Sequence, residues 1–249
     1  MKYTLITGAS SGIGLELAKV FANNKHNLIL VARREELLKE LKKELEKKHK
    51  IKVMIIKEDL SDIKSSYRIK EKLKDKKINV LVNNAGFGDK SLFAKADIKK
   101  TQNMVNLNVT TLTLLTRLFM DDLIKTRGKI LNVASVAAFQ PGPMMSVYYA
   151  TKAYVLNFSE GLAEELKGKV KVSCLCPGAT RTEFEKVAKT NFKGNIPTAR
   201  EVAIYGYDCL NKGKVVAVHG LLFRILVQLN RLLPRSAIRK ISYKVTKDL

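Results

Sequence analysis

Tyr148 and Lys152 have the residue types and the spacing for proton transfer. On a helix, residues four apart project from the same face, one turn from each other. A free phenol has a pKa of about 10, too high for ready proton exchange near neutral pH, and a lysine ammonium held beside it lowers that pKa. We therefore predict that Tyr148 is a general acid and base tuned by Lys152. Tyr149 is a second phenol, but it lacks the four-residue register with Lys152.

The spacing alone also describes an ordinary exposed helix pair, and two further polar residues favour a chemical role. Ser135 follows an apolar run of strand length, and its hydroxyl could share a substrate carbonyl oxygen with the phenol. Asn108, a poor helix former inside an expected helix, is a candidate for holding a water beside Lys152. Ser135 does not fit a hydrolase nucleophile, because no Gly-x-Ser-x-Gly elbow surrounds it.

A glycine-rich turn near the N-terminus, Thr7 to Gly14, predicts a bound nucleotide. It follows the apolar run Tyr3 to Ile6 and enters a segment with helical apolar spacing. A strand, a glycine-dense turn and a helix N-terminus in this order point backbone N–H groups and a positive helix end at a pyrophosphate. A glycine-rich turn without a ligand is the alternative. The predicted dinucleotide contacts in this turn are Gly8, Ser10, Ser11, Gly12, Ile13 and Gly14.

The end of the second apolar run distinguishes between nicotinamide cofactors. Where an NAD-preferring fold places an acid for the ribose hydroxyls, this chain has Ala32, followed by Arg33 and Arg34. A guanidinium pairs with a 2′-phosphate, so we expect NADP(H) to be preferred over NAD(H), with Arg33 as the contact. The alternative interpretation of the two arginines is that they are ordinary surface charges. For Asp59, a further candidate contact, the alternative is a helix N-cap. Further candidate cofactor contacts follow two later strands: Asp59, Leu60, Asn84, Ala85 and Gly86.

Seven apolar runs of strand length alternate with helix-length segments. The runs are Tyr3–Ile6, Asn27–Ala32, Ile51–Ile56, Asn79–Val82, Lys129–Val133, Val170–Leu175 and Val215–Val218. The alternation predicts an α/β fold of the Rossmann type, a doubly wound, mainly parallel seven-stranded sheet with helices on both faces. Between two of the runs, Glu35 to Lys48 should form an outer helix. No repeat or linker divides the pattern, so residues 1–249 are expected to form a single domain.

The composition argues against several other classes of protein. The formal net charge is +23, but the lysines that dominate it are spread over the whole chain, so we expect no nucleic-acid partner. Three cysteines without metal-ligand spacing predict packed core thiols, with Cys174 and Cys176 on one strand face, and no metal site. The sequence lacks an apolar segment of membrane-spanning length and a secretory pattern, so we expect a cytoplasmic protein.

Together these motifs resemble the classical short-chain dehydrogenase/reductase family over nearly the whole chain. The matching positions are Thr7-Gly8-x-x-x-Gly12-x-Gly14, Asp59, Asn83-Asn84-Ala85-Gly86, Asn108, Ser135, Tyr148-x-x-x-Lys152 and Pro177-Gly178-x-x-x-Thr182. The resemblance implies that the tyrosine exchanges the proton and that the lysine lowers its pKa and binds the nicotinamide ribose. It further implies that the serine positions the carbonyl and that the asparagine keeps a relay water.

The same resemblance implies further contacts and an activity. Cofactor contacts are implied for Tyr148, Lys152, Pro177, Gly178, Thr180 and Thr182. A homodimer or homotetramer would pair through the helices that carry Asn108 and Tyr148. The implied activity is that of an NADP(H)-dependent oxidoreductase, with reversible hydride transfer between nicotinamide and a carbonyl or secondary alcohol and with Tyr148 as general acid and base.

The substrate is expected near Phe87, Phe139, Met144 and Met145 and along the segment Glu183 to Asn195. Methionine and phenylalanine make an adaptable apolar pocket, which favours a hydrophobic carbonyl compound or alcohol. Each of these side chains could instead pack the core, where such residues usually lie.

The C-terminal extension, residues 220–249, is amphipathic and basic. It could close the substrate pocket, pack on a partner subunit or make weak peripheral contact with an anionic membrane. Two alternative functions remain: a peripheral membrane ketoreductase acting on acyl or sphingoid lipids, and a catalytically silent NADP(H)-binding sensor. Four catalytic groups at the required spacing argue against the sensor.

Overall fold

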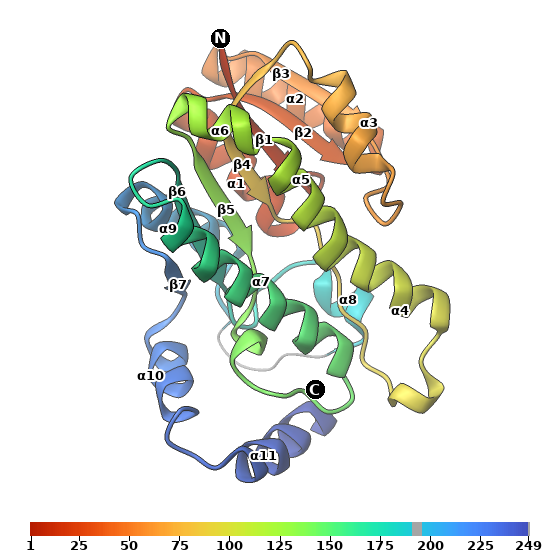
Figure 1. The fold of residues 1–249 in the computed structure, drawn as a ribbon. Coiled ribbons are helices and arrows are strands. Elements are labelled where there is room, and N and C mark those ends of the chain that lie inside the picture. The colour runs from red at the N-terminus through yellow and green to blue at the C-terminus, as the bar shows by residue number, and fades with distance from the viewer. Residues whose placement is uncertain (191–195, 249) are drawn as a thin grey trace.

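A central sheet of seven strands carries the fold (Figure 1). The computed structural model describes residues 1–190 and 196–248. The strands are β1 (Lys2–Thr7), β2 (Asn27–Ala32), β3 (Val53–Lys57), β4 (Lys77–Asn83), β5 (Lys129–Val133), β6 (Lys171–Cys176) and β7 (Val216–Val218). They pair in the order β3-β2-β1-β4-β5-β6-β7, and every pairing is parallel. The predicted doubly wound sheet is confirmed, with a strand in each predicted apolar run.

Helices cover both faces of this sheet (Figure 1). They are α1 (Gly12–Asn23), α2 (Glu35–His49), α3 (Ser65–Lys72), α4 (Ile98–Val105), α5 (Leu112–Leu118), α6 (Met120–Thr126), α7 (Ser146–Glu165), α8 (Phe184–Ala188), α9 (Ala199–Lys212), α10 (Leu221–Leu229) and α11 (Arg235–Asp248). Phe21 of α1 and Leu210 of α9 belong to the core on one face, while Ile69 of α3 and Leu123 of α6 belong to the core on the other. Burial of both faces explains why the strands are continuously apolar.

The carboxyl ends of β1 and β4 define the place where a ligand can bind. The strand order reverses between these two strands, which is where open parallel sheets bind ligands. Thr7 joins the turns that follow them, because its Oγ1 accepts hydrogen bonds from the backbone N–H groups of Asn84 (3.0 Å) and Ala85 (3.1 Å). The same hydroxyl donates to Val82 O at 3.2 Å. The glycine-rich turn and the Asn84-Ala85-Gly86 turn are therefore held side by side.

The helix expected around Asn108 is not regular. A π-helical turn, Asn106–Thr111, separates α4 from α5 and contains Asn108. Such turns add a residue to the helical ladder and are frequent at functional sites. The polar, β-branched stretch Asn106-Leu107-Asn108-Val109-Thr110-Thr111 has low helix propensity, which lowers the cost of the irregularity.

The three cysteines are free and buried, as the sequence predicts. Cys174 and Cys176 project from the same side of β6, and their Sγ atoms are 3.8 Å apart. Cys209 lies on α9 in the core of the opposite sheet face. All three therefore act as small apolar residues of the core.

The C-terminal helices α10 and α11 follow β7 and lie at one end of the molecule, away from the central strands (Figure 1). Side-chain contacts attach them to the loop between β5 and α7: Asn230 Nδ2 donates to Gln140 Oε1 (2.7 Å) and Ser242 Oγ donates to Pro141 O (2.6 Å). The Phe223 ring fills the space in which a Cβ of Gly178 would lie. Among the described residues, no helix has the length and apolarity needed to cross a bilayer.

Candidate active site

Tyr148 and Lys152 lie on the same buried face of α7. Their exposed fractions are 9% and 6%, and the Lys152 ammonium nitrogen is 5.8 Å from the centroid of the Tyr148 ring. Lys152 Nζ also donates a hydrogen bond to Val133 O, 2.7 Å away, at the end of β5. Burial lowers the pKa of Lys152 to about 8, with Cys174 and Cys176 acting in the opposite direction. The arrangement expected from the four-residue spacing is present.

Ser135 lies at the end of β5 and reaches the Tyr148 phenol. Its backbone is extended and caps a short 3₁₀ turn, Val136–Phe139, with Oγ accepting from Ala137 N at 3.1 Å. Burial raises the pKa of the Tyr148 phenol, and the hydrogen bond with Ser135 counteracts part of that rise. Because burial dominates, the phenol holds its proton near neutral pH, and the hydrogen bond with Ser135 fixes its direction.

Asn108 is buried beneath the turn after β4. Its amide forms both hydrogen bonds of a backbone clamp on Phe87, accepting from Phe87 N (3.1 Å) and donating to Phe87 O (2.9 Å). Its Nδ2 also donates to Thr151 Oγ1 at 3.0 Å. A Cβ on Gly86 would lie 3.0 Å from Asn108 Oδ1 and 3.4 Å from Lys152 Nζ. The side chain thus lies close to Lys152, but its amide atoms position the Phe87 turn and the neighbouring turn of α7.

The glycine-rich turn has the geometry that a diphosphate needs. Gly8 and Gly12 have positive φ angles of 67° and 56°, and a Cβ on Gly14 would collide with Gly8 O. Ser11 ends the turn as the N-cap of α1 without capping it through its side chain, so the first N–H groups of that helix face the turn. Glycine at these three positions therefore keeps a cradle open at a helix N-terminus, which fits a pyrophosphate.

Asn84 is tied to this turn. Its Nδ2 donates to Thr7 O (3.0 Å) and to Gly8 O (3.3 Å), so the amide stabilises the strand-to-turn junction of β1. The neighbouring Ala85 and Gly86 leave the surface above Lys152 without large side chains, and Gly86 itself is exposed. The role of Asn84 in this structure is to hold the cradle, and the small residues after it leave the approach to Lys152 free.

The two arginines after β2 have different neighbours. Arg34 extends over the glycine-rich turn, donating from Nη2 to Ser11 Oγ (2.6 Å) and from Nε to Ser10 Oγ (3.2 Å). It also forms a bidentate pair with Glu183, at 3.2 and 2.9 Å. Arg33, the arginine named from the sequence, instead lies near enough to Asp59 to help lower the pKa of that carboxyl.

Asp59 and Leu60 shape the turn after β3. Asp59 Oδ1 accepts from Ser61 N (3.0 Å) and Ser61 Oγ (2.7 Å), and these bonds lower its pKa although partial burial acts to raise it. Leu60 is buried, and its carbonyl accepts from Thr111 Oγ1 at 2.7 Å. The Asp59 carboxylate remains exposed beside Arg33, at the edge where the second strand ends.

The turn after β6 closes the other side of the cradle. Thr182 packs opposite Gly12, where an added Cβ would lie 3.3 Å from the threonine side chain, and its Oγ1 accepts from Phe184 N at 3.1 Å. Thr180 is buried and donates to Gly178 O at 3.0 Å. Buried Pro177 contributes its carbonyl, which accepts from Ser135 Oγ at 3.3 Å. This turn therefore links the glycine-rich turn to the site of proton transfer.

Apolar side chains gather around Tyr148. Phe87 and Met145 belong to this cluster together with Met104, Ala188 and Phe184. Phe139 does not, because it packs with Phe158, Val216 and Phe223 in a separate cluster. Met144 lies next in the chain to Met145, with a positive φ of 64°. Residues 191–195 of the expected substrate segment lie outside the described residues.

Two residues at the start of the expected substrate segment, Glu183 and Phe184, make contacts that sequence reasoning did not predict. The Phe184 ring lies over Tyr148, with ring centroids 5.3 Å apart. Glu183, its neighbour, pairs with Arg34 across the cradle. The only sequence signal for either residue is its place just after the Pro177-to-Thr182 turn. Glu183 lies 149 positions from Arg34, and a contact at that separation leaves no local pattern.

Comparison with known proteins finds similar sequences over most of the chain. The model of the short chain dehydrogenase family matches residues 2–192. Very-long-chain 3-oxoacyl-CoA reductase-B of Danio rerio is 32% identical over 203 residues, which cover 79% of this chain and 65% of that relative. The chain thus spans less than two thirds of that curated relative's length.

Two solved structures are similar over most of their length. A short-chain dehydrogenase from Sphingobium yanoikuyae in complex with NADPH has a TM-score of 0.86 and 29% identity, covering 100% of this chain and 96% of its own. The bulky-bulky ketone specific alcohol dehydrogenase from Comamonas testosteroni has a TM-score of 0.81 and 31% identity, with 93% and 92% covered.

Proposed function

The chain belongs to the short-chain dehydrogenase/reductase family, and from this premise we propose that it is an NADP(H)-dependent oxidoreductase acting on a carbonyl or secondary alcohol. The observation that carries the proposal is the buried pair of Tyr148 and Lys152 beside Ser135, below a glycine-lined cradle. When bound there, the nicotinamide would supply or accept the hydride. The cradle would hold the pyrophosphate, and Lys152 lies where it could bind the adjoining ribose.

The residues of the chain manage one proton. In reduction, Tyr148 Oη donates its proton to the carbonyl oxygen, and in oxidation it takes the proton back. The burial that raises the pKa of Tyr148 keeps the phenol protonated, which suits the direction of reduction. Ser135 Oγ donates a hydrogen bond to the same oxygen and stabilises the charge that develops on it. Lys152 places a cation under the phenol and favours the phenolate when the proton leaves.

The test of this proposal is NADPH oxidation in the presence of a panel of carbonyl compounds. We expect faster turnover with bulky apolar ketones and 3-oxoacyl thioesters than with sugars, because Phe87, Met145 and Phe184 surround the phenol. Tight NADPH binding without turnover of any compound would favour a silent sensor instead. A lipid-directed ketoreductase is the second candidate, supported by this apolar cluster and by the similarity to a very-long-chain 3-oxoacyl-CoA reductase.

The preference for NADP(H) is proposed from Arg34. Its guanidinium lies on Ser10 and Ser11, beside the end of β2 where a ribose acid is absent. A 2′-phosphate that reached this guanidinium would replace Glu183 as the bidentate partner of Arg34. The exposed ion pair is inexpensive to break, because both partners remain solvated.

Arg34→Ala is expected to weaken NADPH binding by about tenfold to a hundredfold, the value of a charge-assisted hydrogen bond, and to leave NADH binding nearly unchanged. Glu183→Gln should instead tighten NADPH binding, since it removes the carboxylate that competes with the 2′-phosphate for Arg34. Titration of both cofactors by fluorescence measures these effects. The matched control is Arg33→Ala. If Arg33→Ala carried the whole loss, or if Arg34→Ala weakened both cofactors equally, the assignment would be wrong.

We also propose that the chain forms a homodimer or homotetramer through α4 and α7. An open apolar groove runs between these helices, lined by Phe93, Val105, Val109, Ser146, Val147, Ala150, Thr151 and Tyr154. Val105 and Tyr154 are exposed in the single chain, so pairing would remove apolar surface from water. Sedimentation equilibrium at micromolar concentration should give a dimer or tetramer mass, and a monomer would contradict the proposal.

A further inference from the structure

We infer that α10 and α11 form a docking surface for an anionic lipid bilayer, with α10 lying in the membrane interface. We call this the C-terminal surface and define it as residues 221–247. The inference concerns a binding property and does not depend on the oxidoreductase chemistry proposed above. It rests on three observations: an outward apolar stripe, a basic border and the place of both helices in the molecule.

The apolar stripe occupies the outer face of α10. The inner face is fixed by Phe223 and by buried Val227, four residues apart. The outer positions follow helical spacing, and their side chains are largely exposed: Leu222 66%, Ile225 50%, Leu226 42% and Leu229 47%. Leu221, Leu232 and Leu233 extend this exposed surface at the two ends of α10. α10 therefore has apolar residues both on its packed face and on the face exposed to water. Exposure of such an apolar patch to water is unfavourable.

The border of the stripe is basic. Between Gly220 and Lys247 the sequence holds seven arginines and lysines and no acidic residue. Arg235, Arg239 and Lys240 on α11 are exposed, and within the described part of the chain none of them pairs with a carboxylate. An apolar helix with a cationic border matches the acyl boundary and the anionic headgroups of a membrane interface. A protein partner would have to supply an apolar groove with an acidic rim.

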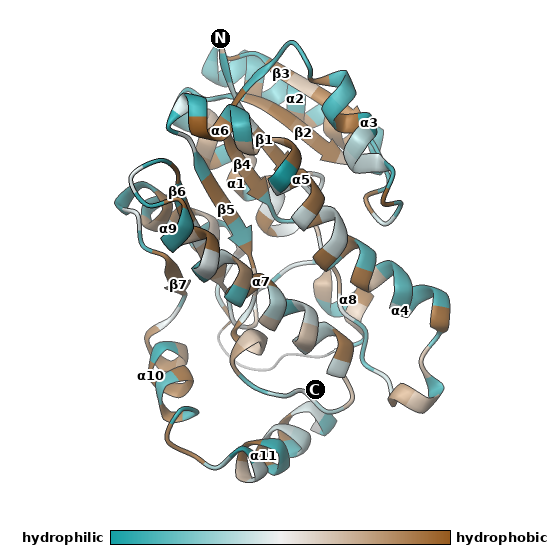
Figure 2. Ribbon diagram, in the orientation of Figure 1, coloured by the Kyte–Doolittle hydropathy of each residue, from teal (hydrophilic) through white to brown (hydrophobic). Residues whose placement is uncertain are grey.

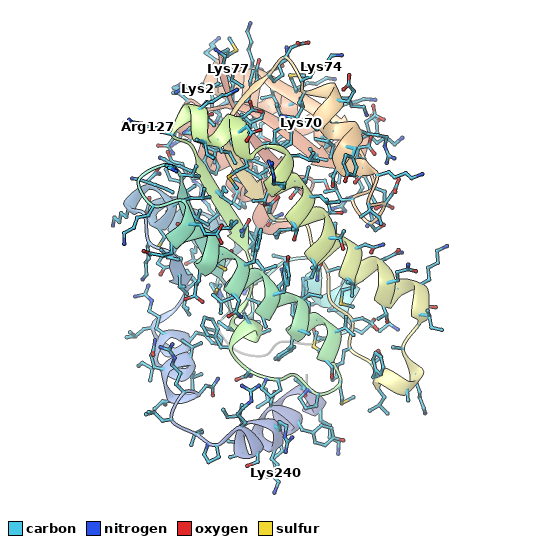
Figure 3. The ribbon with its side chains drawn as sticks, viewed as in Figure 1. Lys2, Lys70, Lys74, Lys77, Arg127 and Lys240 are labelled. Carbon is cyan, nitrogen blue, oxygen red and sulfur yellow. The ribbon has the colours of Figure 1, made fainter. Side chains whose placement is uncertain are left out.

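The arrangement of α10 and α11 leaves this surface accessible. The two helices lie at the end of the molecule opposite to α2 and α3 (Figure 1), and hydrophobic and hydrophilic residues alternate along them (Figure 2). Lys240 lies on α11, far from Lys2, Lys74 and Lys77 at the other end (Figure 3). The groove between α4 and α7 is lined by other residues, so subunit pairing there would leave the C-terminal surface free.

The surface also adjoins the candidate active site. Asn230 and Ser242 contact Gln140 and Pro141, in the loop that leads to Tyr148, and Phe223 contacts the Gly178 turn. A bilayer in contact with α10 would therefore lie beside the loops that border the apolar cluster around Tyr148. An apolar substrate could pass from the acyl region to those loops over a short path.

The test is co-sedimentation of the whole protein with vesicles. We expect binding to vesicles of phosphatidylcholine with about one third phosphatidylglycerol at low salt, and weaker binding to pure phosphatidylcholine or at high salt. Leu222→Asp with Leu226→Asp should lower the partition coefficient by about tenfold or more, because it removes the inserted apolar face. Its control is Ile63→Asp with Tyr67→Asp, which adds the same charge at exposed positions next to and on α3.

A second set of variants separates local from overall charge. Arg235→Glu, Arg239→Glu and Lys240→Glu together should abolish the preference for anionic lipid, whereas Lys2→Glu, Lys74→Glu and Lys77→Glu together should retain it. Equal losses in both triples would overturn the inference, as would no binding of the unmodified protein at low salt. Conversion of an oligomer to a monomer by the leucine pair, without vesicle binding, would assign the surface to a second copy of the chain. NADPH binding and circular dichroism confirm that each variant is folded, so failure of the proposed reaction remains a separate result.

Discussion

Tyr148→Phe is expected to lower the rate constant for carbonyl reduction by about 10²- to 10⁴-fold, which is the usual contribution of a positioned general acid. The ring is buried among Phe87, Met145 and Phe184, so the variant loses the hydroxyl and keeps the packing. NADPH binding should change little, because the cradle that would hold the diphosphate lies on the turn after β1. The measurement is single-turnover NADPH oxidation with a ketone found active in the substrate panel.

The matched control is Tyr149→Phe. Its ring centroid is only 6.1 Å from that of Tyr148, but its phenol is directed to Gln140 and lacks the register with Lys152. We expect this variant to keep a rate within a few-fold of the unmodified protein. Full activity of both variants, or equal loss in both, would show that Tyr148 is not the general acid.

Lys152→Met is expected to abolish turnover and to raise the stability of the protein. Burial lowers the pKa of Lys152 from 10.5 to about 8, so the folded state disfavours the ammonium. At 1.36 kcal/mol per pKa unit this costs about 3 kcal/mol at neutral pH. Loss of the hydrogen bond to Val133 O offsets about 1 kcal/mol of the gain. A net gain of about 2 kcal/mol corresponds to a rise in Tm of roughly 4–8 °C for a chain of this size.

The unfavourable burial of the Lys152 ammonium should also be visible in the pH dependence of unfolding. Below about pH 8 both the folded and the unfolded chain hold the proton on Lys152, and the penalty is fully present. Between about pH 8 and the ordinary lysine pKa of 10.5, the unfolded state binds more protons, so the free energy of unfolding rises with pH. Lys152→Met should lose this slope. Denaturant unfolding at several pH values, compared with the unmodified protein, measures it.

Lys129→Met separates a site effect from a general effect of removing a lysine. Burial, together with Lys171, lowers the pKa of Lys129 at the start of β5, yet Lys129 lies at the end of the strand opposite to Tyr148. This variant should leave turnover unchanged. If Lys152→Met were destabilised, or if it stayed active, the role assigned to the buried ammonium would be wrong.

The strands and the principal groups of the site could be predicted from the sequence because their signals are local. Periodicity places each strand within a few residues, and the spacing of Tyr148 and Lys152 defines one helix face. The glycine-rich turn is a contiguous pattern, and the structure gives Gly8 and Gly12 the positive φ angles that such a turn requires.

The features that the sequence did not reveal depend on contacts between distant segments. Arg34 meets Glu183 across the cradle, and Phe184 meets Tyr148 through the turn that follows β6. Asn84 could be placed near the nucleotide by its position after β4, but its bonds to Thr7 and Gly8 depend on which strand lies beside β4. Such pairings become visible only when the strand order is known.

The π-helical turn at Asn108 also changes the direction in which the continuous helical segment from α4 to α5 presents its side chains. An extra residue in the ladder turns everything after it by roughly 100° about the axis, the angle that one residue adds in an α-helix. The portion before the turn places Met104 in the apolar cluster that contains Tyr148, and the portion after it places Leu115 in the core against the sheet. A regular helix of the same sequence would send one of these two side chains to the wrong neighbour. The irregularity therefore lets the first half of this helical segment contribute to the apolar cluster around Tyr148 while the second half packs on the sheet.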